Sequence, residues 1–309
     1  KRMTLIKRQL KDIELNPPRV LALGFAGLIF LGAFLLNLPI ATASGESIGF
    51  LDALFTSASS VCVTGLVVVN TGMFWSHFGQ VVIICLIQMG GLGFMTMATF
   101  VALILGKKIT LKERLIIKEQ LNQETMSGLV KLTKYIILST FTIEGIGAIL
   151  LSTRFIPKYG FGKGVWFSIF HSISAFCNSI VPFVGDTVVN LTICLLIIIG
   201  GLGFSVYIDI SKNKKFKRFS LHTKLVLLIT LILIVVGTIL IYLIEWNNPG
   251  TLYNLKPKEK ILASFFQAVV PRTAGFNSVN MSKLKDTTVF IMIILMFIGG
   301  SPISTAGGI

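Results

Sequence analysis

Long apolar stretches alternate with short polar segments along the whole chain. A helix needs about 20 predominantly apolar residues to cross a bilayer. Six stretches approach that length: residues 20–40, 78–105, 135–151, 187–208, 225–244 and 289–309. The third is the shortest and contains Glu144, so it is the weakest of the six. The pattern predicts an all-α polytopic membrane protein.

Three further apolar segments are too short to cross a bilayer, and each lies between two predicted spans. They are residues 50–66, 165–180 and 261–276. One interpretation makes them amphipathic surface helices or extracellular loops. The other makes them re-entrant pore loops, because irregular backbone at membrane depth is tolerated only where protein or a water-filled cavity receives its polar groups.

The basic residues predict the orientation of the spans. Residues 1–19, 106–134 and 211–224 hold 19 of the 28 Lys and Arg, whereas residues 41–77 hold none. Loops rich in Lys and Arg remain on the cytoplasmic side. We therefore expect a cytoplasmic N-terminal segment and two cytoplasmic loops in a multi-pass protein of the plasma membrane. All three short segments then enter the membrane from outside.

The order of span, short segment and span occurs three times, in residues 20–105, 135–210 and 225–309. The short segments align as FLDALFTS from Phe50, VWFSIFHS from Val165 and KILASFFQ from Lys260. The following spans carry GGLGF from Gly90, GGLGF from Gly200 and GGSP from Gly299. Each unit begins and ends inside, so the units are parallel, which is an arrangement that can line a central pore. We interpret the Gly-Gly-Leu-Gly strings as sites of close helix packing rather than phosphate loops, because no strand precedes them.

The ends of the short segments carry the candidate chemistry. The first ends in VCVTGL, with Gly65 in fifth position, and the third in PRTAGF, with Gly275 in fifth position. Glycine permits the backbone conformation that turns carbonyls toward an ion. The alternative is that Gly65 and Gly275 only terminate helices. Recurrence in two aligned units favours a carbonyl-lined filter for a monovalent cation, and a divalent site is not expected without a cage of carboxylates.

Composition restricts the other classes. The chain is 53% hydrophobic and 13% charged, with a net charge of +15. Nucleic-acid binding is not expected, because the basic residues lie in short loops between spans. The four cysteines lie in apolar stretches without metal-ligand spacing, so we expect small buried side chains. The sequence contains no nucleophile–base pair and no metal-ligand cluster, so an enzyme is not expected.

The repeated units and their loop motifs resemble the Ktr/Trk/HKT superfamily of potassium and sodium transporters, and most closely the bacterial Ktr membrane subunit. That resemblance covers essentially the whole chain and implies four units of two spans and a pore loop around one pore. It also implies which residues form the filter. They are Val63, Thr64 and Gly65 in the first loop, Cys177 and Asn178 in the second, and Thr273, Ala274 and Gly275 in the third.

Two departures from the family pattern affect these expectations. Asn178 is followed directly by Ser179, where the family has Ala-Gly-Phe. From the loop Phe to the paired Gly there are 35 residues in the first unit, 34 in the third and 30 in the second. We therefore expect about five residues to be missing from the sequence as given rather than deleted in nature. The fourth unit is also missing, so we expect the chain to be part of a longer protein.

The glycine-rich run after Ile298 interrupts the last predicted span. A packing interface of small residues is one interpretation. The resemblance instead implies an intramembrane gate below the filter. Its residues are Gly299, Gly300, Ser301, Pro302, Ser304, Thr305, Gly307 and Gly308.

The resemblance also implies partners and ions. A Ktr subunit is expected to form a homodimer, in contact with membrane lipid, docked on a cytosolic nucleotide-binding ring. The amphipathic segment 107–134 is then either a lipid-bound interfacial helix or a surface near that ring. K⁺ is the expected transported ion, by passive flow or by symport, and Na⁺ as a coupling or activating ion is left open. No cofactor is expected on this chain.

Two charged residues and one alternative function complete the expectations. Glu144 is a functional candidate within a span, or else a hydrogen-bonded group at a helix interface. Arg272 should point away from the filter and pair with an acid or with backbone, since its charge would repel cations. A carrier with a central site for an organic solute is the alternative to an ion pore. It would need more polar groups inside the membrane than Glu144 and Asn190 provide.

Overall fold

The computed structural model describes residues 17–106, 109–120, 128–177, 186–272, 279–302 and 304–307. Within these ranges the chain is helical, and an isolated bridge between Thr42 and Trp75 is the only β pairing. The expected all-α fold is therefore confirmed for the described residues. Asn178, Thr273, Ala274, Gly275 and Gly308 lie outside them.

The first unit contains two long helices with a short one between them. Its elements are α2 (Pro17–Leu36), η1 (Pro39–Ala41), α3 (Phe50–Val61), α4 (Thr71–Phe74), α5 (His77–Leu92) and α6 (Phe94–Ile104). The hydroxyl of Ser76 accepts the Gly79 N–H at 3.2 Å and so caps the start of α5. Such caps satisfy N–H groups that have no partner in the helix.

The second unit repeats this order. After α7 (Leu111–Gln120) it contains α8 (Leu129–Tyr159), α9 (Phe161–Phe176), α10 (Thr187–Leu202) and α11 (Phe204–Lys212). The third unit contains η2 (Phe216–Arg218), α12 (Leu221–Glu245), α13 (Pro257–Val269), η3 (Met281–Lys283) and α14 (Asp286–Ile298). In every unit the first long helix packs along its own short helix, as α2 does on α3, α8 on α9 and α12 on α13.

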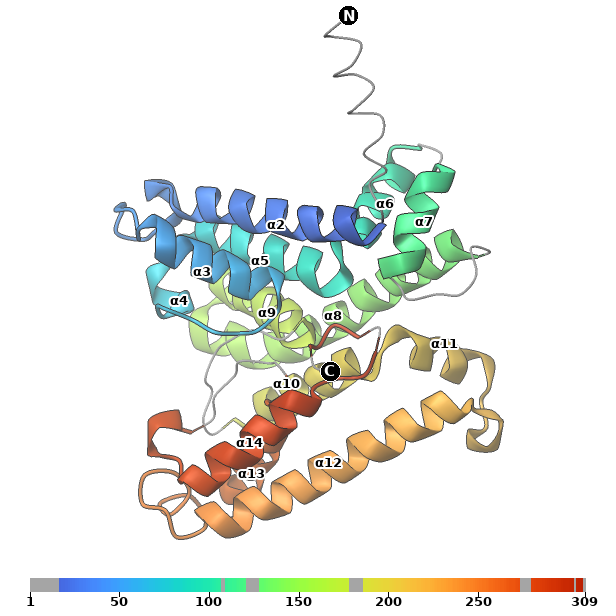
Figure 1. The fold of residues 1–309 in the computed structure, drawn as a ribbon. Helices are drawn as coiled ribbons and strands as arrows, with labels where there is room; N and C mark the ends of the chain where they lie inside the picture. Colours follow the sequence, from blue (N-terminus) through green and yellow to red (C-terminus); the bar gives the residue numbers. More distant parts are fainter. Residues whose placement is uncertain are drawn as a thin grey trace, which may run out of the picture.

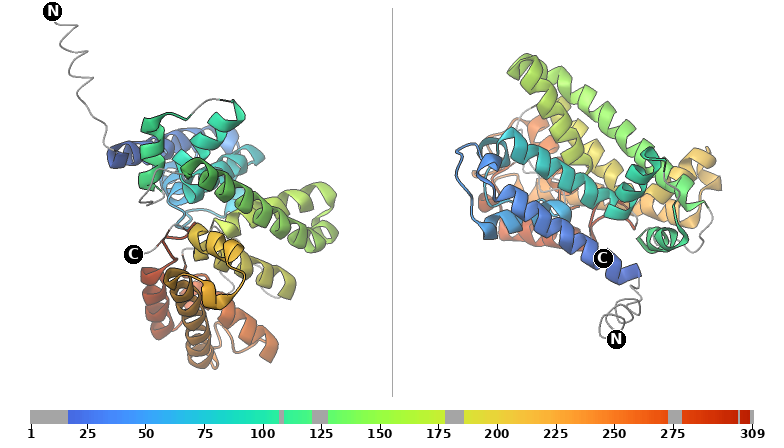
Figure 2. Two further views of the ribbon diagram at one scale, coloured as in Figure 1. Left: turned by 90° about the vertical axis from the view of Figure 1, so that its right-hand side faces the viewer. Right: turned by 90° about the horizontal axis from the view of Figure 1, so that it is seen from above.

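The three units are stacked side by side in chain order (Figures 1 and 2). Helices α6, α7 and α11 lie at one end of the molecule, and α4 lies at the other (Figure 1). Outward-facing apolar side chains cover α2 and α12, a surface that is unfavourable in water and typical of helices in lipid. Examples are Leu23, Phe30, Phe34, Leu228, Leu231 and Val235.

The same glycine contact recurs in each unit, on the first long helix. A Cβ added at Gly32 would lie 2.3 Å from Ser57 Oγ and 2.5 Å from Leu86 Cδ1. A Cβ added at Gly147 would lie 2.5 Å from Ser172 Oγ and 2.8 Å from Leu196 Cδ1. In the third unit Gly237 takes this place, against Ala268 and Leu295. The repeat seen in the sequence therefore has a counterpart in packing.

The second and fourth predicted spans are not single straight helices, which corrects the sequence interpretation. The chain bends by 104° between α5 and α6 and by 88° between α10 and α11. Gly93 (φ 78°) and Gly203 (φ 87°) lie at these bends, in a backbone conformation that residues with a Cβ rarely adopt. Apolar composition continues across each bend, so hydropathy alone could not locate it.

Two other spans differ from their predicted bounds. The third, expected to be the shortest, is the centre of the 31-residue helix α8. The sixth does not continue as a helix, because α14 ends at Ile298 and Gly299 has φ 62°. Three single helices are long and apolar enough to cross a membrane within the described part of the chain. Counting each bent pair as one span raises that number to five.

Candidate functional site

The first predicted filter segment follows directly on the end of α3. Val63 (φ 56°) and Gly65 (φ 72°) both have left-handed backbone conformations, and Val63 is the only residue other than glycine with positive φ in the described ranges. This conformation is costly for a β-branched residue and persists only where its surroundings enforce it. Two such residues separated by one allow the backbone to redirect successive carbonyls, as a carbonyl-lined filter requires.

Hydrogen bonds within the first unit hold this segment. Thr64 donates its N–H to Ser59 O at 3.0 Å and its hydroxyl to Ser59 Oγ at 3.1 Å. Ser59 in turn donates its hydroxyl to Leu66 O at 2.6 Å. Val63 is buried, whereas Cys62 is exposed, which corrects the expectation that all four cysteines are buried. Cys85 is also exposed.

The second predicted filter segment begins at Cys177, at the end of α9. Cys177 is fully buried, and its thiol lies 3.8 Å from Glu144 Oε1 and 3.7 Å from Gln88 Oε1. The Gln88 amide donates to Glu144 Oε2 at 3.2 Å. Helices α5, α8 and α9 therefore meet at one buried polar cluster, and Glu144 is a hydrogen-bonded group at a helix interface. Gln88 was not among the predicted site residues, because nothing local in the sequence links it to Glu144 and Cys177, which lie 56 and 89 positions away.

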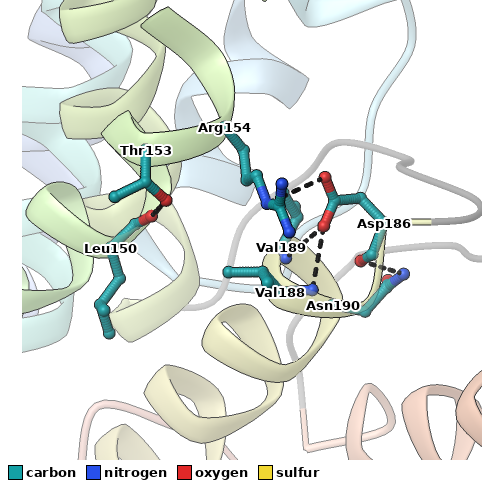
Figure 3. Close-up of polar contacts among 7 residues, drawn as sticks. All are labelled: Leu150, Thr153, Arg154, Asp186, Val188, Val189 and Asn190. Atoms are coloured by element: carbon teal, nitrogen blue, oxygen red, sulfur yellow. Dashed lines mark hydrogen bonds and ion pairs between the residues drawn. The ribbon is translucent and has the colours of Figure 1, made fainter. Parts of the chain in front are cut away.

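Asp186 is the first described residue after this segment (Figure 3). Its Oδ1 accepts the N–H groups of Val188 and Val189 at 2.9 and 3.3 Å and so caps α10. Arg154 Nε of α8 lies 3.6 Å from Asp186 Oδ2. Both side chains are at least one-third exposed, so the ion pair contributes about 1 kcal/mol or less. The cap is therefore the stronger of the two restraints on the start of α10.

The third short helix leads to Arg272, which is 4% exposed. Its guanidinium donates to the carbonyl of Thr230 at 3.3 Å and to the Thr230 hydroxyl at 3.4 Å. The expectation of a backbone partner is therefore confirmed, and that partner lies on α12. Thr273, Ala274 and Gly275 lie outside the described residues, and their place in a filter stays a prediction.

The glycine-rich segment crosses the middle of the molecule beside the end of α10 (Figure 1). Gly300 N donates to Gly307 O at 2.8 Å, which closes the segment into a loop. Ser301 donates its N–H and its hydroxyl to Gly201 O, both at 3.0 Å. Thr305 donates its N–H to Gly200 O at 3.2 Å and its hydroxyl to Phe176 O at 2.7 Å. The segment thus contacts the second unit through two residues of the repeated glycine motif.

A cavity of about 460 Å³ borders this segment. Its walls come from the start of α2, the bend after α5, α7 and the glycine-rich segment. The residues that face it include Pro18, Leu21, Gly91, Glu119, Phe204 and Ser304. Within the described part of the chain, no group of His, Cys, Asp or Glu could hold a metal ion.

The repeated glycines lie against the ends of the short helices. A Cβ at Gly90 would lie 2.1 Å from Val61 O, and a Cβ at Gly200 would lie 2.3 Å from Phe176 O. Val61 and Phe176 are the last residues of α3 and α9. The expected close packing at Gly-Gly-Leu-Gly is therefore confirmed, and each glycine allows one long helix to touch the start of a predicted filter segment.

Comparisons with known proteins agree on one family. Residues 29–309 match the family model TrkH, described as a cation transport protein. The chain is 48% identical to the Ktr system potassium uptake protein B of Bacillus subtilis, covering 99% of this chain and 71% of the relative. It is 42% identical to the potassium/sodium uptake protein NtpJ of Enterococcus hirae, covering 99% of this chain and 69% of that protein.

A solved structure shares the fold. The potassium transporter TrkH from Vibrio parahaemolyticus matches with a TM-score of 0.67 at 18% identity. The match covers 96% of this chain and 60% of that chain. The helical arrangement described above is therefore found in a known membrane transporter.

Proposed function

The chain belongs to the TrkH family of cation transport proteins, and from this membership we propose that it takes up K⁺ through a pore lined by backbone carbonyls. As a member of this family it is a cation transporter and not an enzyme. The names of the relatives support K⁺ as the ion, with Na⁺ as a second ion in the Enterococcus hirae relative.

One observation carries the proposal. Val63 and Gly65 have left-handed conformations in a segment that lies at the end of a short helix and is held by its own hydrogen bonds. A neutral carbonyl site of this kind binds a monovalent cation after the ion loses water and releases it again. Cys177, Asn178, Thr273, Ala274 and Gly275 are proposed to contribute the corresponding carbonyls from the other units.

The glycine-rich segment is proposed as the gate. Gly299, Gly300, Ser301, Pro302, Ser304, Thr305, Gly307 and Gly308 are the residues assigned to it. Its irregular backbone lies between α10 and a cavity, which supports a place in the ion path. Opening would require the segment to leave its hydrogen-bond partners on α9 and α10.

Orientation and partners follow from charge and family. The ends that carry α7 and α11 are proposed to be cytoplasmic in a bacterial plasma membrane, since the adjoining segments are rich in Lys and Arg. On α7, Ile116 and Ile117 are buried, whereas Leu111 and Leu115 are exposed. The exposed face is proposed to meet lipid or a cytosolic nucleotide-binding ring, in a homodimer of this chain.

Ion uptake by cells tests the proposed function. Bacteria that lack their own K⁺ uptake should accumulate Rb⁺ when they express the full-length protein, and an excess of labelled organic solutes should not compete. Uptake of an organic solute without Rb⁺ uptake would favour the carrier alternative and overturn the proposal.

A substitution at the proposed filter sharpens this test. Gly65→Ser places a side chain at φ 72° and should lower the preference for K⁺ over Na⁺ by about tenfold or more, because the carbonyls must shift. Gly45→Ser is the matched control, since Gly45 has φ 76° and no atom within 4 Å of an added Cβ. Equal ion preference in both variants would contradict a filter at Gly65.

A further inference from the structure

The end of α10 exposes carbonyls that the helix itself cannot satisfy. The last four carbonyls of any α-helix lack intrahelical donors. In α10, which ends at Leu202, the Tyr207 hydroxyl donates to Ile199 O. The next two carbonyls, those of Gly200 and Gly201, receive donors from the glycine-rich segment of another unit. The glycine-rich segment of the third unit therefore caps α10, a helix of the second unit.

The end of α9 is capped in the same way. Phe176 is the last residue of α9, and its carbonyl accepts the Thr305 hydroxyl at 2.7 Å. Thr305 is 4% exposed, so water does not compete freely for this bond. One residue thus donates to the ends of two helices, through its N–H to Gly200 and through its hydroxyl to Phe176.

Glycine at position 200 makes this meeting sterically possible. An added Cβ there would lie 2.3 Å from Phe176 O and 2.7 Å from Thr305 Oγ1. On the other side of the same junction, a Cβ at Gly91 would lie 3.0 Å from Cys177 Sγ and 3.8 Å from Thr305 Cβ. Thr305 is therefore packed against the residues that lead into the second predicted filter segment.

The corresponding site of the first unit is arranged differently. There Gly90 O accepts the N–H of Gly93 at 3.1 Å, within the turn that ends α5. In the second unit the equivalent carbonyl, that of Gly200, accepts from Thr305 instead. The first unit caps this position itself, whereas the second depends on the third.

We propose that Thr305 is a positioning residue that couples the glycine-rich segment to the second filter segment. In the closed arrangement its hydroxyl fixes the end of α9, from which Cys177 leads into the proposed filter, and its N–H fixes the end of α10. Movement of the segment removes both donors, so conduction and ion preference change together. This inference rests on the proposed function, because it assumes that the segment gates a cation pore.

The test removes one hydroxyl and keeps the shape of the side chain. Thr305→Val in the full-length protein retains the backbone bond to Gly200 and loses the bond to Phe176. The weaker closed state should raise the initial rate of Rb⁺ uptake by about two- to tenfold, the range expected for one hydrogen bond. The ratio of Rb⁺ to Na⁺ uptake should fall in the same variant, which a purely structural role would not produce.

Three further variants separate the causes. Thr305→Ser restores the hydroxyl and should return both readouts toward wild type. Ser301→Ala removes only a side-chain bond to Gly201 O on α10 and leaves the bond from Thr305 to Phe176 in place, so it should change ion preference less than Thr305→Val does. Thr238→Val is the background control, because its hydroxyl bonds to Ile234 O within α12.

The outcomes distinguish this inference from the proposed function. Absence of Rb⁺ uptake by the wild-type protein would overturn the function itself. Uptake by wild type, combined with a Thr305→Val variant that keeps its ion preference or loses uptake at normal membrane abundance, would overturn only the coupling. If Thr305→Val does not reach the membrane, Thr305→Ala gives the same two readouts without the added methyl group.

Discussion

The first and second proposed filter segments follow equivalent helices, but the ends of these helices are held by different parts of the molecule. In the first unit, Ser59 forms hydrogen bonds with Thr64 and with Leu66, all within one short helix and its loop. In the second unit, the start of the segment is held by Glu144, by Gln88 from the first unit and by Thr305 from the third. After this segment, Asp186 caps the start of α10 (Figure 3).

This difference shows that two repeated units can keep the same packing while different parts of the molecule hold the ends of their short helices. Both units keep the glycine contacts at Gly32 and Gly147, so their helices pack alike. Three residues before these glycines, the first unit has Ile29 and the second unit has Glu144. A segment with its own bonds is insulated from its neighbours, whereas a segment held by other units responds when they move.

The largest expected effect comes from filling the space at Gly200. Gly200→Ala places a Cβ 2.3 Å from the backbone carbonyl of Phe176, so the helix end, the glycine-rich segment or both must shift. Overpacking of this kind costs about 1–3 kcal/mol. We expect Rb⁺ uptake to be nearly lost and the melting temperature of the purified protein to fall.

Gly27→Ala is the control for that experiment. Gly27 lies in α2 with no atom within 4 Å of an added Cβ, and alanine favours a helix by up to about 1 kcal/mol. This variant should match or exceed wild type in stability. A loss of uptake of the same size in both variants would refute a specific contact at Gly200.

The sequence allowed much of this architecture to be predicted, since hydropathy and three recurring motifs identify the units and their short segments. The predicted third span was shorter than α8, because Glu144 and the Lys and Arg residues near both ends make this helix less apolar, although packing with α9 stabilises it. The apolar pattern also predicted straight spans across Gly93 and Gly203, where one backbone dihedral decides the direction of the chain. The bond between Thr305 and Phe176 joins residues 129 positions apart, and no local pattern encodes such a pair.

An intermediate effect is expected from making the second unit resemble the first at Glu144. Glu144→Ile removes the acceptor of the Gln88 amide and of the Cys177 thiol in a buried site. Leaving a buried polar group without a partner costs about 1–3 kcal/mol. The variant should melt at a lower temperature and discriminate less well between Rb⁺ and Na⁺ in uptake assays.

Glu144→Gln is the matched comparison, because it keeps an oxygen for Gln88 and has nearly the same volume. It should retain most of the stability and ion preference that Glu144→Ile loses. If the two variants behave alike, the hydrogen bonds of Glu144 do not hold the second segment, and the contrast between the units loses one of its supports.

The smallest effect is expected in the first unit, where the restraint is local. Ser59→Ala removes the donor to Leu66 O and the acceptor of the Thr64 hydroxyl, whereas the bond from Thr64 N to Ser59 O remains. With the backbone bond intact, we expect the free energy of unfolding to fall by about 0.5–1.5 kcal/mol. We also expect a modest fall in the ratio of Rb⁺ to Na⁺ uptake. Ser60→Ala is the neighbouring control, since the Ser60 hydroxyl bonds to Thr56 O in the preceding turn.

Because no contact with the glycine-rich segment is involved, Ser59→Ala should change ion preference without raising the uptake rate. A rise in rate like that expected for Thr305→Val would mean that the first segment is also coupled to the proposed gate.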